Sequence, residues 1–581
     1  MKKHYETHVE DTDKLISVAG PVLDYKSWYE RYRKLMEEQA QRKYGLYTPT
    51  SEGDDDFPSI PGITARYSAL GLTNEEMSKN PVWVDKTGNG HDLQMKNFAW
   101  RGMSGCGGYS LSKKTFSYTP DIYSLNFTDL SVSTKEYDVY FQLIGLDENS
   151  GITFNLDVRE SGTAKRIKRE TYTKDGIYHF EYKSEDDATN LYMIGYNGDG
   201  GDRTTFTVKI LPYYPDALVF DGVDDYGICD NFPILTKEKG YTVVALRKWL
   251  TPENKTNNEI LVANLKEPRW VAENWGVFGC EIKYNNTNPK TIRTMSFGNT
   301  PVINVNENNV LLCQTSNNYN GVDIVSGNNT SGPYLLICSG GTSFFAKAAI
   351  WELIILDHDA TEEELTKIKN YFVKTYPWLF FDQAWTVTGK TNEDTDRATI
   401  TNITGNGNDL ILSNFGFAEG SGYNEQGEYA GYLVTDGVDD NIVSSAFVLD
   451  KKFTVVGEWK FIVSESKRAG IVFPSKLYAY NEKENMQVYI NTPITGNTLQ
   501  NIRSFKALTS DGKLYDNNWE ERVLKAGDMG LTRNTITFGG FIQNNVFTQI
   551  AFKNLGIYNS QTLSKEDMIK AYIYLQTLKA K

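Results

Sequence analysis

The chain has 581 residues, 40% of them hydrophobic and 13% aromatic, so it can bury several cores, and we expect about three or four domains. Its net charge of −14 argues against a protein that binds nucleic acid through a basic face. The N-terminus has no apolar signal region and no run approaches a membrane span, so we expect a soluble protein made in the cytosol, without export signal or membrane anchor.

Residues 1–57 differ in character from the rest of the chain. A helix is expected to start after Asp24 or Ser27 and to run to about residue 42, because apolar residues recur there with helical spacing. The acidic stretch 48–58 then reads as a linker. Such a short helix needs tertiary contacts for stability. It either folds back on the neighbouring β domain, or docks on a partner or a second copy of the chain.

Two blocks of sequence occur twice, in the same order, which predicts two copies of one domain. Thr87–Leu93 (TGNGHDL) returns as Thr404–Leu410 (TGNGNDL), and Asp221–Asp225 (DGVDD) returns as Asp436–Asp440. Short runs of Thr, Val, Tyr and Ile, broken by Asn, Gly and Asp, are typical of β domains. Further matches pair Tyr241–Val244 with Phe453–Val456, and Trp351–Leu356 with Phe552–Tyr558.

The spacing of these blocks shows that the first copy carries an insertion. The first pair of blocks begins at residues 87 and 404, which are 317 positions apart, and the second pair begins at 221 and 436, which are 215 apart. The difference of 102 residues is enough for a small domain. We therefore expect a first repeat (58–109 plus 215–380), an insertion (110–214) and a second repeat (381–581).

The insertion alternates apolar and polar residues, which predicts half-buried strands and a small β-sandwich. Turn signals lie at Asp175-Gly176 and at residues 197–201. The expected strands are 137–143, 152–158, 177–182 and 205–211.

Each repeat is expected to close with a strand and one capped helix. Thr361 and Glu364 have the spacing of a capping box, and Ser564 and Asp567 repeat it. The residues expected to face the core are Leu365, Ile368, Tyr371 and Phe372 in the first helix, and Met568, Ile569, Tyr572 and Leu575 in the second.

All cysteines lie in the first repeat, at an odd count of five, and none forms a CxxC pair. A disulfide framework confined to one of two related domains is improbable, so buried free thiols are expected. The five histidines show no metal-ligand spacing. The cysteines are Cys106, Cys229, Cys280, Cys313 and Cys338.

Two acidic groups invite a calcium hypothesis, because hard cations bind clustered carboxylates. Asp-Gly and paired Asp equally suit a turn between strands, in which the side chains bond the backbone. We favour the turn and assign no metal ligand and no cofactor. The groups are Asp221, Asp224 and Asp225, and Asp436, Asp439 and Asp440.

No catalytic constellation is visible, so no catalytic residue is assigned and a non-enzyme is expected. Glycoside hydrolysis needs two carboxylates about 5 to 9 Å apart. The nearest acidic clusters, Glu362–Glu364 and Glu482 with Glu484, fall on a helix start and a loop. No Gly-x-Ser-x-Gly elbow and no P-loop occurs, and the TGNG blocks lie in a β-loop context.

Sugar binding stays open, because exposed aromatic rings stack on sugar faces. Packing in a core or at a sheet edge is the likelier role of any single ring, so no ligand-binding residue is assigned. The aromatics in Asn- and Gly-rich surroundings are Trp270, Trp275, Tyr319 and Tyr334 in the first repeat, and Tyr478, Tyr480 and Tyr489 in the second.

The chain resembles the laminin-G/concanavalin A-like β-sandwich superfamily in its LVFDGVDDY segment, the TVV strand after it, and a closing strand followed by a capped helix. Its combination WxDxTGNGxDLxxxNF, SGxGGY and FDGVDD is similar to virion surface proteins of tailed phages that infect Bacteroides-type bacteria, including crAss-like phages. The second repeat departs at Thr435 in place of Phe220, and at Ile400 and Asn402 in place of Trp83 and Asp85.

This resemblance implies two jelly-roll sandwiches, the first interrupted by the insertion, and a structural role on the virion surface as a head fibre or capsid decoration protein. Residues 1–57 would attach the protein to the capsid or another virion protein, or form a homo-oligomer. The sandwiches would then adhere to host or mucus glycans. Alternatives are a tail-associated adhesin or a bacterial cell-surface glycan-binding protein, and, last, a glycoside hydrolase. The fold alone does not decide among them.

Overall fold

Strands dominate the computed structural model, and the prediction of a mostly β protein is confirmed. The structure describes most of residues 57–580. Besides residues 1–56 and shorter interruptions, the stretches outside the described residues are 119–135, 184–188, 198–205, 251–258, 266–277, 286–291, 296–310, 316–331, 463–469 and 529–535. The expected N-terminal helix therefore lies outside the described residues. Among the described helices, none is both long and apolar enough to cross a bilayer.

The first repeat contains two sheets. Sheet 1a has the order β18(Leu311–Thr315), β14(Thr242–Trp249), β20(Lys347–Leu356), β12(Leu218–Asp221), β4(Gly105–Cys106), and β1(Ile63–Ser68) also pairs with β20. Sheet 1b has the order β17(Ile292–Met295), β16(Phe278–Asn285), β15(Glu259–Leu265), β19(Tyr334–Ile337), β13(Tyr226–Cys229), β3(Leu93–Lys96), β2(Val82–Trp83). A buried core joins the two sheets, with Phe220, Val243 and Ile355 from sheet 1a and Trp83 and Leu335 from sheet 1b.

The strands of the insertion pair only with one another among the described residues, and the four expected strands are present. One sheet has the order β10(Thr189–Asn197), β7(Ile152–Glu160), β8(Arg166–Tyr172), and the other β5(Thr115–Tyr118), β11(Phe206–Ile210), β6(Glu136–Ile144), β9(Gly176–Lys183). Strands β5, β8 and β10 were not predicted. Strand β8 exposes most of its residues, so its sequence lacks the apolar alternation of its neighbours.

Two sheets also form the second repeat, around a core that includes Trp385, Leu433, Trp459 and Phe552. Sheet 2a has the order β24(Gly422–Asn424), β25(Tyr432–Val434), β39(Ile550–Asn559), β27(Phe453–Phe461), β32(Ala507–Thr509), β33(Lys513–Tyr515), β34(Glu521–Val523), and β21(Gln383–Thr386) also pairs with β39. Sheet 2b has the order β22(Thr399–Ile400), β23(Leu410–Ser413), β26(Asn441–Ser444), β36(Thr537–Phe538), β28(Gly470–Phe473), β29(Leu477–Glu482), β30(Asn485–Pro493), β31(Asn497–Leu499), and β35(Gly527–Asp528) also pairs with β30. A separate hairpin joins β37(Gly540–Phe541) to β38(Val546–Phe547).

Strand pairing refines the sequence correspondence between the repeats. Strand β14 pairs with β20 and shifts register after Leu246, and β27 pairs with β39 and shifts register after Glu458. Each shift leaves one residue of the partner strand without a residue opposite it. These residues are Trp351 in β20 and Lys553 in β39. Trp351 therefore corresponds to Lys553, one position later than the sequence match placed it.

In the described part of the chain, three α-helices and two 3₁₀ turns accompany the strands. They are α4(Asn74–Lys79), α5(Glu362–Thr375), α6(Lys565–Gln576), η3(Pro377–Leu379) and η4(Gly427–Tyr429). The capping box at the start of α5 is confirmed, because Thr361 accepts from the Glu364 amide and the Glu364 carboxylate accepts from Thr361. Ser564 caps α6 in the same way, by accepting from the Asp567 amide. The sequence did not predict α4.

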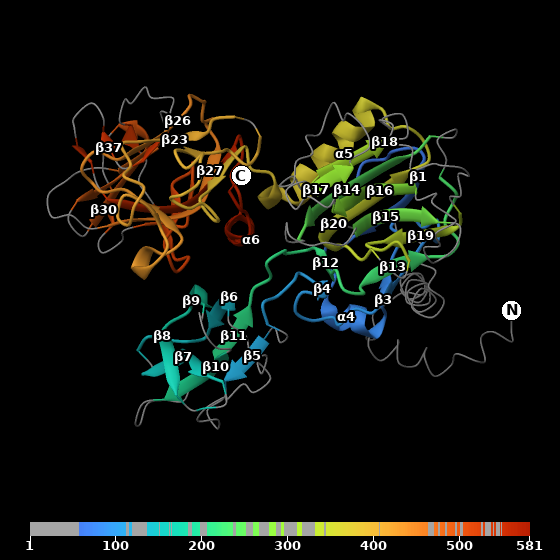
Figure 1. The fold of residues 1–581 in the computed structure, drawn as a ribbon, viewed down its shortest axis with the longest axis horizontal. Helices are drawn as coiled ribbons and strands as arrows, with labels where there is room; N and C mark the ends of the chain where they lie inside the picture. Colours follow the sequence, from blue (N-terminus) through green and yellow to red (C-terminus); the bar gives the residue numbers. More distant parts are fainter. Residues whose placement is uncertain are drawn as a thin grey trace, which may run out of the picture.

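The helix α6 is buried more completely than a one-sided amphipathic helix. The four expected core residues of α5 are buried. In α6 the expected Met568, Tyr572 and Leu575 are buried and Ile569 is half-buried, and the helix also buries Ala571, Ile573 and Tyr574. The reason is that α6 packs within one core that includes residues of both repeats and of the insertion. In Figure 1, α6 lies at the side of the second repeat nearest the first.

Polar contacts reinforce this three-way joint. Lys570 Nζ on α6 lies 2.8 Å from Asp216 Oδ2, in the segment between the insertion and β12. Lys248 Nζ on β14 donates to the Thr577 hydroxyl at 2.7 Å. From the insertion, Lys174 Nζ lies 2.7 Å from Glu520 Oε1 of the second repeat. Apolar packing and ion pairs thus tie the three parts together.

The expected free thiols are confirmed at Cys106, Cys229 and Cys338, which are buried and form no disulfide. Burial raises the pKa of the Cys338 thiol well above its usual value, so it is an unreactive core residue. The side chains of Cys280 and Cys313 lie outside the described part of the chain.

Candidate functional site

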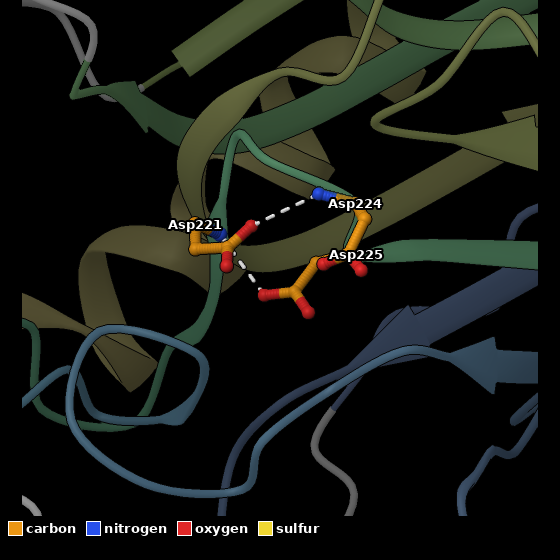
Figure 2. Close-up of side chains that lie close together, drawn as sticks. All are labelled: Asp221, Asp224 and Asp225. Carbon is orange, nitrogen blue, oxygen red and sulfur yellow. Dashed lines mark hydrogen bonds between the residues drawn. The ribbon is translucent and has the colours of Figure 1, made fainter. Parts of the chain in front are cut away.

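The acidic turn of the first repeat follows β12 and is a hydrogen-bonded loop. Asp221 Oδ1 accepts the backbone N–H groups of Val223, at 2.7 Å, and of Asp224, at 3.4 Å. The Asp221 amide donates to Asp225 Oδ2 at 3.0 Å, as Figure 2 shows. Gly222 has φ +73°, which a side chain rarely adopts, and a Cβ there would meet Lys347. These are the features of a side-chain-stabilised turn.

The second repeat reproduces this turn nearly bond for bond. Asp436 Oδ1 accepts from the Val438 amide at 2.7 Å, and the Asp436 amide donates to Asp440 Oδ2 at 2.8 Å. Gly437 again has φ +73°. The DGVDD sequence therefore forms the same side-chain-stabilised turn in both repeats.

The carboxylates nevertheless converge enough to be weighed as cation ligands. In each turn, one oxygen from each of the three aspartates lies within 4.8 Å of the others. Burial raises the pKa of Asp225 to about 7 and that of Asp440 to about 6. The raised pKa values weaken both carboxyls as cation ligands, and backbone N–H groups already occupy one oxygen of Asp221, Asp225, Asp436 and Asp440. The geometry supports the turn interpretation, and the absence of a metal stays a prediction.

The TGNG blocks form a second pair of equivalent loops, which link β2 to β3 and β22 to β23. Asp85 Oδ1 accepts from the amides of Arg66 and Thr87, both at 3.0 Å. Asn402 Oδ1 accepts from the amides of Ala384 and Thr404, both at 3.1 Å. The change from Asp85 to Asn402 keeps these bonds, so the loop is structural. Its amides are engaged within the protein, which does not suit a phosphate cradle.

The acidic clusters considered for hydrolysis have structural positions. The first turn of α5 contains Glu362, Glu363 and Glu364, and Glu364 closes the capping box. His358 Nε2 lies 3.2 Å from Glu364 Oε2. Glu482 ends β29, and Glu484 lies outside the described residues.

Of the aromatics considered for sugar stacking, Tyr334 is half-buried against Ile260, Ala263, Leu265 and Leu336, which favours its packing role. Trp270, Trp275 and Tyr319 lie outside the described part of the chain. In the second repeat, β29 pairs with β30 so that Tyr478 is directly opposite Tyr489. Tyr480 lies two positions further along β29. The side chains of these three tyrosines lie outside the described part of the chain.

Sequence reasoning missed a cluster on the outer face of sheet 2a, which we call the lysine–tyrosine patch: Tyr429, Tyr432, Lys460 and Lys553. Lys460 Nζ lies 4.5 Å from the centre of the Tyr429 ring and 5.4 Å from that of Tyr432. Lys553 Nζ lies 5.7 Å from the centre of the Tyr432 ring. All four residues are half-buried. These are cation–π distances.

A buried network supports one side of the patch. The Tyr432 hydroxyl donates to Glu458 Oε1 at 2.6 Å, and Lys506 Nζ lies 3.3 Å from Glu458 Oε2. The Tyr572 hydroxyl on α6 donates to the same carboxylate. Burial alone would raise the pKa of Glu458, but Lys506, Lys553 and the two hydroxyls outweigh it and hold that pKa well below its usual range. The network fixes the Tyr432 ring in place.

Comparisons with known proteins leave the family open. No family model and no curated protein matches the chain. Partial likenesses to solved structures include the botulinum neurotoxin serotype D binding domain, with 15% identity over 34% of this chain and 51% of that one, and a TM-score of 0.23. The Trypanosoma rangeli sialidase has 10% identity over 40% of this chain and 41% of that one, with a TM-score of 0.24. The chain thus spans about half and two fifths of their lengths, and at such scores the likenesses imply nothing about function.

Proposed function

We propose that this protein is a non-enzymatic structural protein of a phage virion surface, a head fibre or capsid decoration protein, and that its β units adhere to host or mucus glycans. The assignment to a virion depends on the sequence resemblance in the TGNG and DGVDD segments. The structural observation that carries the proposal is the core shared by both repeats and the insertion, centred on α6.

This shared core supports a display role because it holds several β units in fixed relative positions. Trp351 of the first repeat packs against Tyr574 of α6, with ring centres 6.0 Å apart, and Tyr140 of the insertion lies 6.4 Å from Tyr572. A displayed module has to keep its orientation on a particle. Flexible linkers between the units would not do so.

Glycan adhesion is the part of the proposal that the repetition supports. Two related units on one body can offer two sites, and many copies on a particle multiply them, so weak sites gain avidity without new contacts. Tyr478, Tyr480 and Tyr489 belong to the neighbouring strands β29 and β30 of sheet 2b, and we propose them as candidates for stacking on sugar rings.

Immunogold electron microscopy of intact particles, with antibody against the second repeat, tests the location. We expect label on the head. Label confined to the tail would favour the tail-associated adhesin, and protein found only in cell-envelope fractions would favour the bacterial glycan-binding protein. Release of sugar from a polysaccharide panel would contradict the non-enzymatic assignment.

Deletion of residues 1–57 tests the attachment role of the N-terminal segment. We expect the truncated protein to fold, because the buried residues of the described cores lie between Ile60 and Leu578 and the deleted Phe57 only packs at the edge of one of them, and to be lost from particles. The full-length chain expressed from the same vector is the control. Unchanged incorporation of the truncated protein would refute attachment through this segment.

A further inference from the structure

We propose that the lysine–tyrosine patch of the second repeat binds a carboxylate-bearing sugar residue, such as a uronic or sialic acid, within a glycan. This inference depends on the adhesion part of the proposed function and not on the location of the protein in a virion. It names the substrate class that one of the two repeats recognises.

The patch lies where the first repeat is apolar and covered. By strand register, Lys553 corresponds to Trp351, Glu458 to Leu246 and Tyr432 to Ala217. The three residues of the first repeat are all buried in the shared core. In the second repeat, the same positions of the sheet face thus carry ionisable or hydroxyl-bearing side chains.

What covers the first repeat at this place is α6. Tyr574 of α6 packs on Trp351, and Thr577, just after the helix, accepts from Lys248. Lys248 itself corresponds to Lys460 of the patch. The same helix reaches Glu458 beside the patch through the Tyr572 hydroxyl, but the Lys460 side chain keeps 32% of its surface exposed. The equivalent positions are therefore covered in sheet 1a and partly exposed in sheet 2a.

The patch retains cationic groups that are only weakly neutralised. Lys506 forms an ion pair with Glu458, and Lys553 also helps to lower the pKa of Glu458, but among the described residues no carboxylate lies within ion-pair distance of Lys553 Nζ. Lys460 has Glu428 at 3.7 Å, but that glutamate is 73% exposed, and such surface pairs contribute little. An incoming carboxylate can accept hydrogen bonds from both ammonium groups.

The surroundings favour a single carboxylate over a dense polyanion. Glu428 borders the patch. The pKa of Tyr432 is raised mainly by burial, and Glu181 of the insertion is close enough to raise it further. The chain as a whole carries a net charge of −14. A polyphosphate or heavily sulfated chain would be repelled by this field, whereas one acidic sugar meets two lysines locally. The Tyr429 and Tyr432 rings supply apolar surface for its pyranose ring.

A glycan array probed with the full chain tests the proposal. We expect binding to sialylated and uronate-terminated glycans, and no binding to the same glycans after the carboxylates are converted to methyl esters. The variant Lys460→Gln/Lys553→Gln should lose about tenfold or more in affinity, since two charge-assisted hydrogen bonds are removed. The control Lys451→Gln/Lys452→Gln removes the same charge from exposed positions of the same repeat and should bind as the parent does.

The outcomes separate this site from the proposed function. Equal binding of acid and ester glycans, or unchanged binding by the patch variant, would overturn the site. So would the absence of any glycan binding by a protein that immunogold places on particles, and that result would leave the virion role standing. Far-ultraviolet circular dichroism and melting curves of both variants exclude misfolding, and Tyr432→Phe, which keeps the ring, should retain acid-dependent binding.

Discussion

Replacing Lys570 with alanine should loosen the joint between the repeats and the insertion. Lys570 Nζ lies 2.8 Å from Asp216 Oδ2, and the two side chains are only 19% and 23% exposed. It also lies 4.3 Å from the centre of the Trp378 ring. Burial by itself lowers the pKa of Lys570, but Asp216 and Glu566 outweigh it and raise that pKa, so the lysine is charged at neutral pH.

The magnitude follows from these contacts. A hydrogen bond between charged groups contributes about 1.5 to 3 kcal/mol, and the cation–π contact adds about 0.5 to 1 kcal/mol. Truncation also leaves the Asp216 carboxylate partly buried without its partner. We therefore expect Lys570→Ala to reduce the free energy of unfolding by about 2 to 3 kcal/mol.

Urea denaturation measures this change, and hydrogen exchange of residues 206–221 shows whether the loss is at the joint. The control is Lys367→Ala on α5, whose i,i+4 pair with Glu363 is exposed and should contribute about 0.5 kcal/mol or less. A double-mutant cycle with Asp216→Asn should give a coupling energy of about 1 kcal/mol or more. A Lys570→Ala variant within about 0.5 kcal/mol of the parent would refute the reasoning.

Three further predictions concern the core and the acidic turns. Trp351→Ala should cost about 3 to 5 kcal/mol of unfolding free energy, because the fully buried ring packs between Tyr214 and Tyr574. The Asp225→Asn/Asp440→Asn variant should lose less stability than the parent as pH rises from about 4 to 7, because burial raises both pKa values above the usual 3.8. Calcium at millimolar concentration should leave the melting temperature unchanged, since the turns are closed by their own N–H groups.

Each of these has a clear contrary outcome. Trp351→Phe keeps a ring but loses the indole N–H bond to Pro215 O at 2.8 Å, so it should lie between parent and alanine variant; equal losses would refute the packing argument. For the aspartates the sign is fixed: the folded protein holds protons that the unfolded chain releases, so stability falls as pH rises towards 7. An equal dependence of the free energy of unfolding on pH in parent and variant would contradict this prediction. A rise in melting temperature with calcium but not magnesium would revive the metal hypothesis.

Local signals in the sequence were reliable guides to the fold. The Thr361 and Glu364 spacing predicted a real capping box, because a cap depends only on neighbouring residues. The DGVDD turns were predicted for the same reason. The burial of α6 was underestimated, because its Ile573-Tyr574-Leu575 run meets a different part of the molecule and not its own sheet alone. Such a run cannot lie on one face of a helix, and it is the signal that could have revealed the joint.

The lysine–tyrosine patch could not be found from sequence spacing. Its members come from η4, β25, β27 and β39, and Lys553 in β39 lies far along the chain from the other three. The sequence match paired the six residues Trp351–Leu356 with the seven residues Phe552–Tyr558 and began at the aromatic Phe552, whereas strand pairing gives Lys553. Only strand pairing shows that a buried tryptophan in one repeat corresponds to a lysine in the other.

The way in which the insertion is attached has a consequence for how such chains diversify. Its two connecting segments lie side by side, because the Tyr213 amide donates to Gly108 O and the Tyr214 amide to Gly107 O, both at 2.9 Å. The ends of this module are thus fastened to each other before the chain rejoins β12. Recombination can replace what lies between them at the cost of the contacts that Tyr140 and Lys174 make with the second repeat, and the entropic cost of a longer replacement grows only logarithmically with length. The first repeat therefore has an insertion point at which another domain, natural or engineered, can be placed.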